Sequence, residues 1–549
     1  MQVLIAALVA ALCTIGCDSE GGGAGGAAGT GGMGGAGGES GAGGGEPAAF
    51  AITVSVSGLS GTLVLQNNGG DALTTTENGE VTFETLLADG ASYAVTVGSG
   101  PPLQGCIVTN GEGTVTAGNI SDVVVRCAYL PFFQANDGVG GSELWKTDGT
   151  SAGTQRVKDI WPGANGSDSG PMLRIGDLWF LRASDGTHGS ELWASDGTED
   201  GTRMVMDIQE GPDGSSPQGF AAFEGLLFFA ADDGLNGQEV WMSDGTQDGT
   251  QLLVDLSPTN ANPRSLTAVG STLYFVATDP SAGHELRKTD GTAEGTALVK
   301  DILLGSGSGG VGRLTAFDDV LYFRATRDLH LWRSEGTSET TSTVTTAVMF
   351  VNGLTVVEST LFFSADDAVE RELWKSDGSE AGTQRVADIN PNGGDSDPEW
   401  LTELGGELLF TADDGTNGRE LWKSDGTSEG TELVHDIHDS GDSIPEHLTN
   451  RNGLLFFRAD DGENGVELWA SDGTTGDTAL LSDIWAGDTS SSPIPVDDGA
   501  DTFGIFQDIV VFFADDGEHG LELWKSDGTP EGTVLVKDIN EGPSPGKGE

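Results

Sequence analysis

The motif ELWxxDGT recurs along most of this 549-residue chain and restricts the folds that it can adopt. It reads "ELWKTDGT" from Glu143, "ELWASDGT" from Glu191 and "ELWKSDGT" from Glu420, with near-copies between them. The nine copies lie about 47 residues apart on average, which is the length of a four-stranded propeller blade. Because a unit of this size cannot bury its apolar face alone, neighbouring copies must stack on one another. We therefore expect a repeat architecture.

Each copy divides into short strands separated by turn residues. In the third copy "LLFFAA" (226–231) leads through "DDGLNG" to "QEVW", then through an Asp-Gly-Thr turn to "TQLLVDL" (250–256). A strand such as "SLTAV" (265–269) then turns at Gly270 and Ser271, residues suited to tight hairpins, so neighbouring strands should be antiparallel. Runs such as "LLFF" lack in-out alternation, which indicates that both faces of each sheet are covered.

This pattern predicts an all-β protein, with a large β-propeller of eight to nine four-stranded blades over residues 129–549. The first copy lacks an upstream "LTxxGG" strand, and no such strand follows the ninth copy. The pattern therefore leaves open how a ring would close and how many blades it would contain.

The residues before the repeats fall into three segments. Residues 1–16 contain a short apolar run typical of an export signal, and residues 17–47 are a Gly-rich segment that we expect to act as a flexible tether. Residues 48–128 consist of short β-branched runs between Gly and Asn turns, which predict a small β-sandwich of the immunoglobulin-like or transthyretin-like kind.

The end of the apolar run resembles a bacterial lipoprotein signal, since Thr-Ile-Gly precedes Cys17. This resemblance implies that Cys17 carries lipid and anchors the protein in the cell envelope, in the outer membrane or at the cell surface. Asp18 after the cysteine leaves inner-membrane retention as an alternative. An ordinary secretory signal is the other interpretation of residues 1–16.

The four cysteines fit an oxidising compartment. Cys13 would leave with the signal and Cys17 would carry lipid, so Cys106 and Cys127 remain to form one disulfide. No free thiol is then left for catalysis.

The charge balance excludes two classes of partner. The chain has 25 basic and 86 acidic residues, a formal net charge of −61, which opposes binding to nucleic-acid phosphates or to an anionic membrane surface. Divalent cations, basic proteins and neutral glycans remain as ligands.

Residues 130–540 resemble the ELWxxDGT repeat family of bacterial exported and lipoprotein sequences, on the copies quoted above and on "ELWASDGT" from Glu467. The resemblance implies a propeller-like fold. It implies no established activity.

The tryptophan of the motif is the most regular feature of the repeat. Indole rings can serve as stacking platforms for sugars, but an apolar residue at fixed register in nearly every copy is typical of packing between blades. We expect packing for Trp145, Trp193, Trp241, Trp332, Trp374, Trp422, Trp469 and Trp524.

The "DDGxNGxE" turns are candidates for binding Ca²⁺, because they carry several oxygen ligands around glycines. Solvated acidic turns are the alternative, and no cofactor is required by the pattern. The residues concerned are Asp232, Asp233, Asn236, Glu239, Asp413, Asp414, Asn417, Glu420, Asp460, Asp461, Asn464 and Glu467. A zinc site at His435, His438 and His447 is weaker, since no second ligand shell accompanies these histidines.

Two copies depart from the pattern and are where a unique site would be sought. The fourth reads "ELRKTDGT", with Arg287 in the tryptophan position, and the fifth reads "HLWRSEGT", with His330 and Glu335. No set of catalytic residues stands out, so the hypothesis is a lipid-anchored, non-catalytic binding or scaffolding module for a protein or glycan ligand. The alternative is a propeller hydrolase or lyase acting on extracellular polysaccharide.

Overall fold

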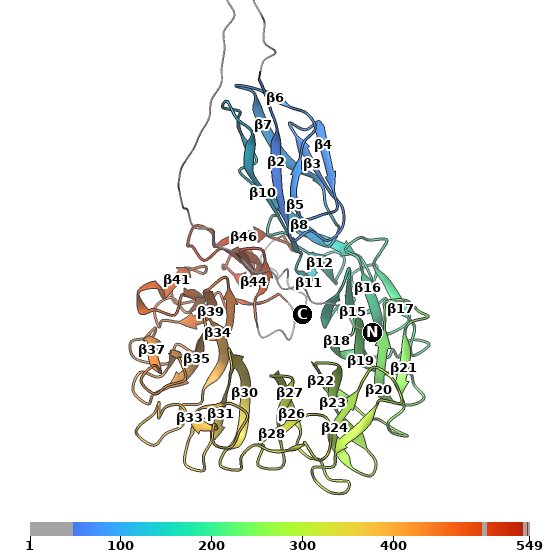
Figure 1. Ribbon diagram of the computed structural model, residues 1–549, viewed down its shortest axis with the longest axis vertical. Coiled ribbons are helices and arrows are strands. Elements are labelled where there is room, and N and C mark those ends of the chain that lie inside the picture. Colours follow the sequence, from blue (N-terminus) through green and yellow to red (C-terminus); the bar gives the residue numbers. More distant parts are fainter. Residues whose placement is uncertain (1–47, 497–501, 542–545, 547–549) are drawn as a thin grey trace, which may run out of the picture. The chain divides into compact units, whose positions relative to one another are not determined.

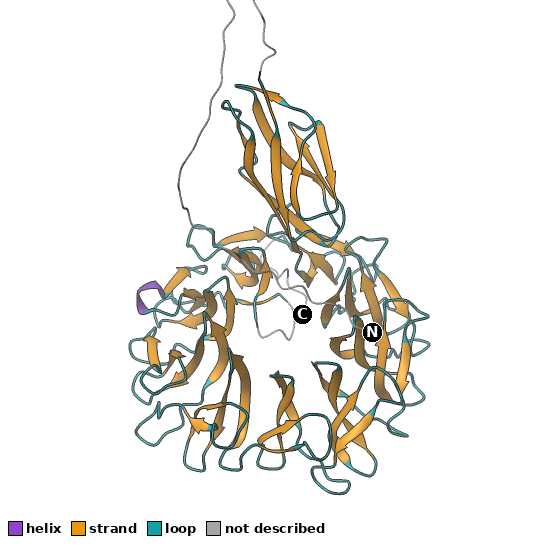
Figure 2. Ribbon diagram, viewed as in Figure 1, coloured by secondary structure: helices purple, strands orange, loops and turns teal. Residues whose placement is uncertain are grey.

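The computed structural model describes residues 48–496, 502–541 and 546. The signal, Cys17 and the Gly-rich segment lie outside these residues. The described chain is almost entirely β-structure, with a single 3₁₀ turn, η1 (Thr475–Asp477). None of its helical segments has the length and apolar character needed to cross a membrane. The all-β class predicted from the sequence is confirmed (Figure 2).

Residues from Ala49 to Tyr129 form two four-stranded sheets and one two-stranded sheet. The strands are β1 (Ala49–Phe50), β2 (Ile52–Ser57), β3 (Leu63–Asn67), β4 (Asp71–Thr75), β5 (Gly79–Thr82), β6 (Leu87–Ala88), β7 (Ser92–Ser99), β8 (Gln104–Thr109), β9 (Glu112–Thr114) and β10 (Ile120–Tyr129). The four-stranded sheets have the orders β5-β2-β10-β8 and β4-β3-β7-β9, and β1 pairs with β6. Alternation along β2 turns Ile52 and Val54 inward, where they pack with Leu65 of β3 in the core between the two sheets.

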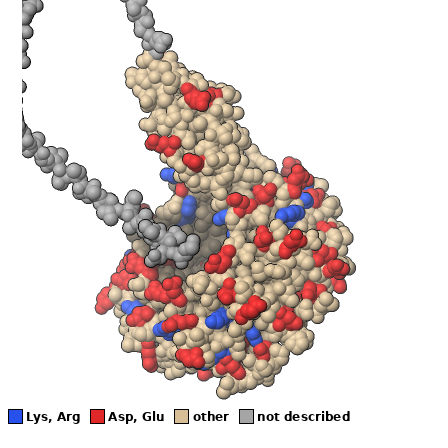
Figure 3. All heavy atoms as spheres, turned by 45° about the vertical axis from the view of Figure 1, so that its right-hand side comes forward, with Lys and Arg blue, Asp and Glu red and all other residues tan. Residues whose placement is uncertain are grey.

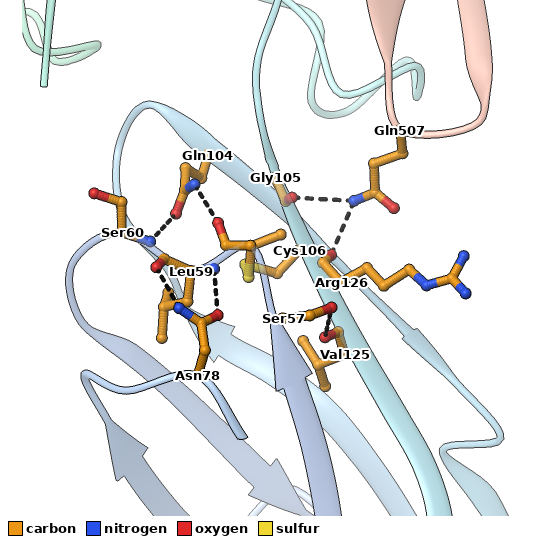
Figure 4. Close-up of a disulfide and its surroundings, with 12 residues drawn as sticks. Ser57, Leu59, Ser60, Asn78, Gln104, Gly105, Cys106, Val125, Arg126 and Gln507 are labelled. Atoms are coloured by element: carbon orange, nitrogen blue, oxygen red, sulfur yellow. Dashed lines mark hydrogen bonds between the residues drawn. A yellow bond between two sulfur atoms is a disulfide. The ribbon is translucent and has the colours of Figure 1, made fainter. Parts of the chain in front are cut away.

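A disulfide joins the last two strands of this region. Cys106 on β8 lies directly opposite Cys127 on β10 in the antiparallel ladder, and the two residues are bonded (Figure 4). This is the pair expected from the cysteine count. Beside it, Gln507 of the last repeat donates to the carbonyl oxygens of Gly105, at 3.2 Å, and Arg126, at 3.0 Å.

The repeats form nine successive sheets, which we number in chain order. Sheets 1 to 3 contain β11 (Phe132–Asn136), β12 (Ser142–Lys146) and β13 (Gln155–Lys158); β14 (Met172–Ile175), β15 (Leu178–Ser184), β16 (Ser190–Ser195) and β17 (Arg203–Met206); and β18 (Gln218–Phe223), β19 (Leu226–Asp232), β20 (Gln238–Ser243) and β21 (Gln251–Val254). Sheets 4 to 6 contain β22 (Arg264–Val269), β23 (Thr272–Asp279), β24 (Gly283–Thr289) and β25 (Ala297–Lys300); β26 (Gly312–Phe317), β27 (Val320–Ala325), β28 (His330–Ser334) and β29 (Ser342–Thr343); and β30 (Met349–Val357), β31 (Thr360–Asp366), β32 (Arg371–Ser376) and β33 (Gln384–Arg385). Sheets 7 to 9 contain β34 (Glu399–Leu404), β35 (Glu407–Asp413), β36 (Arg419–Ser424) and β37 (Glu432–His435); β38 (Glu446–Arg451), β39 (Leu454–Asp460), β40 (Val466–Ser471) and β41 (Ala479–Ser482); and β42 (Ile494–Pro495), β43 (Gly504–Phe506), β44 (Ile509–Asp515), β45 (Leu521–Ser526) and β46 (Val534–Lys537).

Strands that follow one another in sequence pair antiparallel within each sheet, as the turn residues predict. Gly270, between β22 and β23, has a φ of +56°, a backbone conformation that glycine adopts without steric cost. Two sheets depart from four strands. Among the described residues sheet 1 has only three, which agrees with the missing upstream segment, and the first strand of sheet 9 is in two pieces, β42 and β43, both paired with β44.

Consecutive sheets pack face to face through apolar clusters that contain residues of both sheets. Phe228 and Val240 of sheet 3 share such a cluster with Leu273 and Phe275 of sheet 4. The covered faces explain why the central strands lack alternation, since β19 is buried at five successive positions. Figure 1 shows the sheets following one another in chain order.

The last sheet also packs against the first. Trp145 of sheet 1 lies in one cluster with Val511 and Leu523 of sheet 9. The Nζ of Lys525 on β45 donates to the carbonyl oxygen of Gly149, after β12, at 2.8 Å. Backbone hydrogen bonds add to this contact, since the Asn136 amide donates to the Gly546 carbonyl oxygen at 2.7 Å and the Gly546 amide donates to that of Leu521 at 2.9 Å. In the described residues the two ends of the series therefore meet through side-chain packing and these hydrogen bonds, without a shared strand.

Candidate functional site

The glutamate of the repeated motif is a structural group. The Glu420 side chain is fully buried, and its Oε2 accepts from the Ile437 amide at 2.8 Å and from the Ser443 hydroxyl at 2.5 Å. It thereby holds the loop that follows β37 against β36. Burial raises the pKa of this carboxyl to about 7. The same rise to about 7 is found for Glu143, Glu239, Glu285, Glu372, Glu467 and Glu522.

The repeated tryptophans lie between sheets, as the packing interpretation predicts. Trp422 contacts the cluster formed by Leu373 and Val386 of the preceding sheet and is 8% exposed. Trp145, Trp193, Trp241, Trp374 and Trp469 are buried in the same way, whereas Trp332 and Trp524 are partly buried. Rings enclosed in this way offer no open face to a sugar.

The Asp-Gly-Thr segment is a turn that satisfies its own polar groups. Asp425 Oδ1 accepts from both the amide and the hydroxyl of Thr427, each at 2.7 Å. Thr427 Oγ1 accepts from the Gly430 amide at 3.0 Å, and the Ser424 hydroxyl lies 2.8 Å from that of Thr431. The hydrogen bonds from Thr427 hold the pKa of Asp425 below its usual value.

The turns considered for Ca²⁺ use their carboxylates internally. Asp233 Oδ1 accepts from the amides of Leu235 and Asn236, and Oδ2 accepts from the Asn236 side chain at 2.8 Å. Glu239 lies on β20, fully buried, and accepts from the Leu256 amide at 3.0 Å. The structure therefore does not gather Asp232, Asp233 and Glu239 into one ligand group, because the strand carries the glutamate into the sheet packing. The turns at Asp413, Asp414, Asn417 and Glu420 and at Asp460, Asp461, Asn464 and Glu467 have the same internal bonds.

In the described part of the chain, one group of three acidic residues could hold a cation. It consists of Glu370, Glu372 and Asp388 in sheet 6. The guanidinium of Arg385 already lies among these carboxyl groups. Its Nη1 donates a hydrogen bond to Glu370, and its Nη2 lies 3.9 Å from Asp388 Oδ2. Arg385 is thus already paired with two of the three carboxyl groups.

The residues of the divergent copies serve their own sheets. Arg287 replaces the tryptophan on β24, is 6% exposed, and its Nη2 pairs with Asp279 Oδ2 at 2.5 Å. The Nδ1 of His330 lies 2.6 Å from the carbonyl oxygen of Val348, and Glu335 pairs with Arg333 at 2.6 Å. None of the three lines the cavities described below.

The histidines considered for zinc do not form a group. The ring of His447 packs against Trp400, with centroids 5.1 Å apart, and against Phe503, at 5.9 Å. His438 instead lies beside Gly462. His435 is the last residue of β37.

A cavity of about 450 Å³ lies where the first strands of sheets 3 and 4 meet, and it is the candidate binding site. It is lined by Gln218, Gly219, Gln238, Asn262, Pro263, Arg264, Ser265 and His284. The lining offers amide, hydroxyl, guanidinium and imidazole groups and no carboxylate. Burial and the neighbouring Arg264 lower the pKa of His284, whose Nδ1 lies 3.1 Å from the Thr278 hydroxyl.

A second cavity, of about 470 Å³, lies at the junction of the N-terminal sheets and the repeats. Its lining includes Pro101, Pro102, Leu103 and Tyr129. Arg174 stacks on the Tyr129 ring at 3.5 Å, and Ser60 is bonded to Asp177 at 3.2 Å, so several of its polar groups are already engaged. We therefore place the candidate site between sheets 3 and 4.

Sequence reasoning pointed to the fourth and fifth copies but missed Arg264 and His284. A comparison of the copies could have revealed Arg264, because it is the first residue of its strand where other copies have Gln218, Glu399 or Glu446. His284 stands directly before the motif glutamate, the position of Gln238, Arg371 and Arg419 in other copies, and it follows a turn of different sequence, "DPSAG".

Comparison with known proteins gives no family. No protein-family model matches the chain, and no curated protein matches it. Among solved structures, the computationally designed Ika8 protein aligns with 18% identity over 65% of this chain and 96% of its own, with a TM-score of 0.38. Puromycin hydrolase aligns with 13% identity over 74% of this chain and 57% of its own, with a TM-score of 0.36. A prolyl endopeptidase aligns with 12% identity over 64% and 55%, with a TM-score of 0.37.

Proposed function

We propose that this protein is an exported, lipid-anchored lipoprotein of the cell envelope that presents a nine-bladed β-propeller as a non-catalytic binding module. Cys17 would carry the lipid, and the Gly-rich segment would separate the folded part from the membrane. The propeller proposal is supported by nine consecutive sheets, each packed on the next, and by the packing of sheet 9 on sheet 1. On this proposal each sheet is one blade, including the three-stranded sheet 1.

The observation that carries the binding proposal is the contrast between the repeated residues and the cavity between sheets 3 and 4. Motif residues such as Glu420 and Trp422 are buried in packing, and Asp425 is used within its turn. The cavity instead presents Gln218, Gln238, Asn262 and Ser265, whose amides and hydroxyl can both donate and accept hydrogen bonds. Such groups suit a hydroxyl-rich ligand, so we favour a glycan over a protein.

The test is a binding screen of the full chain, purified in detergent, against arrays of glycans and of cell-envelope proteins. We expect a glycan to bind, and Gln238→Ala to weaken that binding, because its amide lines the cavity. Gln155→Ala, on the exposed face of β13, is the matched control. Binding that is lost equally in both variants would contradict the proposed site, and the absence of any ligand would contradict the proposed function.

The same preparation tests the enzymatic alternative. The proposal predicts that polysaccharides incubated with the protein keep their length. New reducing ends or unsaturated sugar products, lost in a His284→Ala variant, would show that the cavity is an active site of a hydrolase or lyase.

A further inference from the structure

Basic side chains without acidic partners gather on the first strands of sheets 4 and 5. The first strands of neighbouring sheets contact one another along the series, so β22 and β26 lie side by side. Arg264 is the first residue of β22 and is exposed, and Arg313 is the second residue of β26 and is also exposed. Neither forms an ion pair with any residue that the structure describes.

Sheet 8 shows the carboxylate partner that the arginines of sheets 4 and 5 lack. In sheet 8 the first residue of the strand is Glu446, which lies directly opposite Arg458 and forms an ion pair with it. In sheet 5 Gly312 takes the place of that glutamate, opposite Arg324. Arg324 therefore keeps its charge without a carboxylate partner, and its Nη1 reaches only the carbonyl oxygen of Val351, at 3.5 Å.

In sheet 4 an arginine replaces the glutamate, and a valine replaces the arginine opposite it. Arg264 occupies the position of Glu446, opposite Val276. Two neighbouring sheets thus replace a glutamate–arginine pair by unpaired cations. Burial and the nearby Arg313 lower the pKa of Arg324, as expected where cations lie close together without a counter-ion.

These cations stand out in a chain with a formal net charge of −61. Figure 3 shows acidic side chains spread over the face of the molecule that it presents. Neither Arg264 nor Arg313 is paired with a carboxylate of the described residues. Their isolation on two adjacent strands, beside a cavity of about 450 Å³, indicates that the anion they meet comes from outside.

We propose that Arg264, Arg313 and Arg324 form, with the cavity between sheets 3 and 4, a binding site for an acidic glycan bearing carboxylate groups. The inference rests on the proposed function and specifies its ligand. Guanidinium groups bind carboxylates through two parallel hydrogen bonds, while Gln218, Gln238 and Asn262 bind sugar hydroxyls.

A nucleic acid is a poor fit to the same site. The residues lining the cavity include no tryptophan, tyrosine or phenylalanine ring, the broad platforms on which successive bases stack. A long polyanion would also meet the strongly acidic surface beyond the three arginines, whereas a glycan with spaced carboxylates can place one at the site.

The experiment compares two probes by calorimetry with the full-length protein. One is a galactose oligosaccharide with a single galacturonate residue, and the other is the same oligosaccharide with that carboxyl group reduced to an alcohol. We expect the acidic probe to bind at least about tenfold more tightly than the neutral one, because hydrogen bonds between charged groups are stronger than neutral ones. Its affinity should fall as NaCl is raised.

Arg264→Gln and Arg313→Gln should each weaken binding of the acidic probe at least about tenfold, for the same reason. Arg126→Gln is the matched control, since it removes one exposed arginine charge from β10 of the N-terminal sheets. Equal affinities for the two probes, no binding of the acidic probe, or equal effects of Arg264→Gln and Arg126→Gln would each overturn this inference. A neutral glycan or protein that binds in the screen would leave the proposed function standing, whereas no ligand at all would overturn both.

Discussion

Phe133 of sheet 1 and Phe513 of sheet 9 meet edge to face, with ring centroids 5.8 Å apart. These residues are 380 positions apart in the sequence, and both are fully buried. Their contact joins the first and last sheets through the same kind of apolar cluster that joins consecutive sheets elsewhere.

Removal of one ring should therefore weaken the junction between the first and last sheets. We expect Phe513→Ala to lower the free energy of unfolding by about 3–5 kcal/mol, the usual cost of truncating a buried phenylalanine. Phe350→Ala, at a position 42% exposed, is the control and should cost much less. Thermal and denaturant melting measure the difference, and equal effects of the two substitutions would argue against the observed junction.

The buried motif glutamates predict that the protein is more stable at pH 5 than at pH 8. The pKa of Glu420 is about 7 in the folded chain, above its ordinary 4.5, so the folded protein holds more protons between these values. The free energy of unfolding therefore falls as pH rises from about 4.5 to about 7. Seven carboxyls with this shift should make the fall in melting temperature large.

Added salt distinguishes the effect of the buried glutamates on stability from repulsion among surface charges. Melting in 0.5 M NaCl weakens interactions between exposed carboxylates but leaves buried groups largely unscreened. If the buried glutamates are responsible, the dependence on pH persists at high salt. A melting temperature that no longer varies between pH 5 and pH 8 in high salt would contradict this cause.

The disulfide should stabilise the N-terminal sheets. Replacing Cys106 and Cys127 together by alanine is expected to cost about 2–4 kcal/mol, since the bond restricts the unfolded chain. Hydrogen exchange measured at β8 and β10 should rise in the variant, with exchange in β35 of sheet 7 as the internal control. Unchanged protection at β8 and β10 would show that the core formed by residues such as Ile52 and Val125 suffices.

The lipid anchor predicts how the protein fractionates. Cys17→Ala should move the protein from the membrane fraction to the soluble fraction, because a single cysteine would carry the anchoring lipid. Cys13→Ala, within the predicted signal, is the control and should leave the distribution unchanged. A wild-type protein that is already soluble would contradict the lipoprotein proposal.

Calcium should have no specific effect at the acidic turns, because Asp233 and Asp414 already accept hydrogen bonds from their own turns. After chelation, millimolar Ca²⁺ is expected to shift the melting temperature no more than Mg²⁺ at the same concentration, since both screen the acidic surface. A larger shift with Ca²⁺, lost in Asp414→Asn, would restore the turns as Ca²⁺ sites.

Several features of the fold follow from residues that are close in the sequence. Gly270 and its neighbour predict a hairpin, and β22 and β23 pair across it. The fixed register of Trp422 predicts packing between sheets, and the side chain lies there. Short-range turn chemistry and periodic burial are local properties, so one copy compared with the others reveals them.

The sequence alone determined the class of the fold, the antiparallel pairing of successive strands within the repeats, the missing strand of sheet 1 and the pair Cys106–Cys127. Only the tertiary structure decided that Phe133 meets Phe513, that Glu239 is withdrawn from its acidic turn, and that Arg264 stands without a carboxylate beside Arg313. These relationships depend on how separate sheets are brought together. Because contacts between sheets join residues with no common spacing along the chain, they cannot be found from the pattern of one repeat.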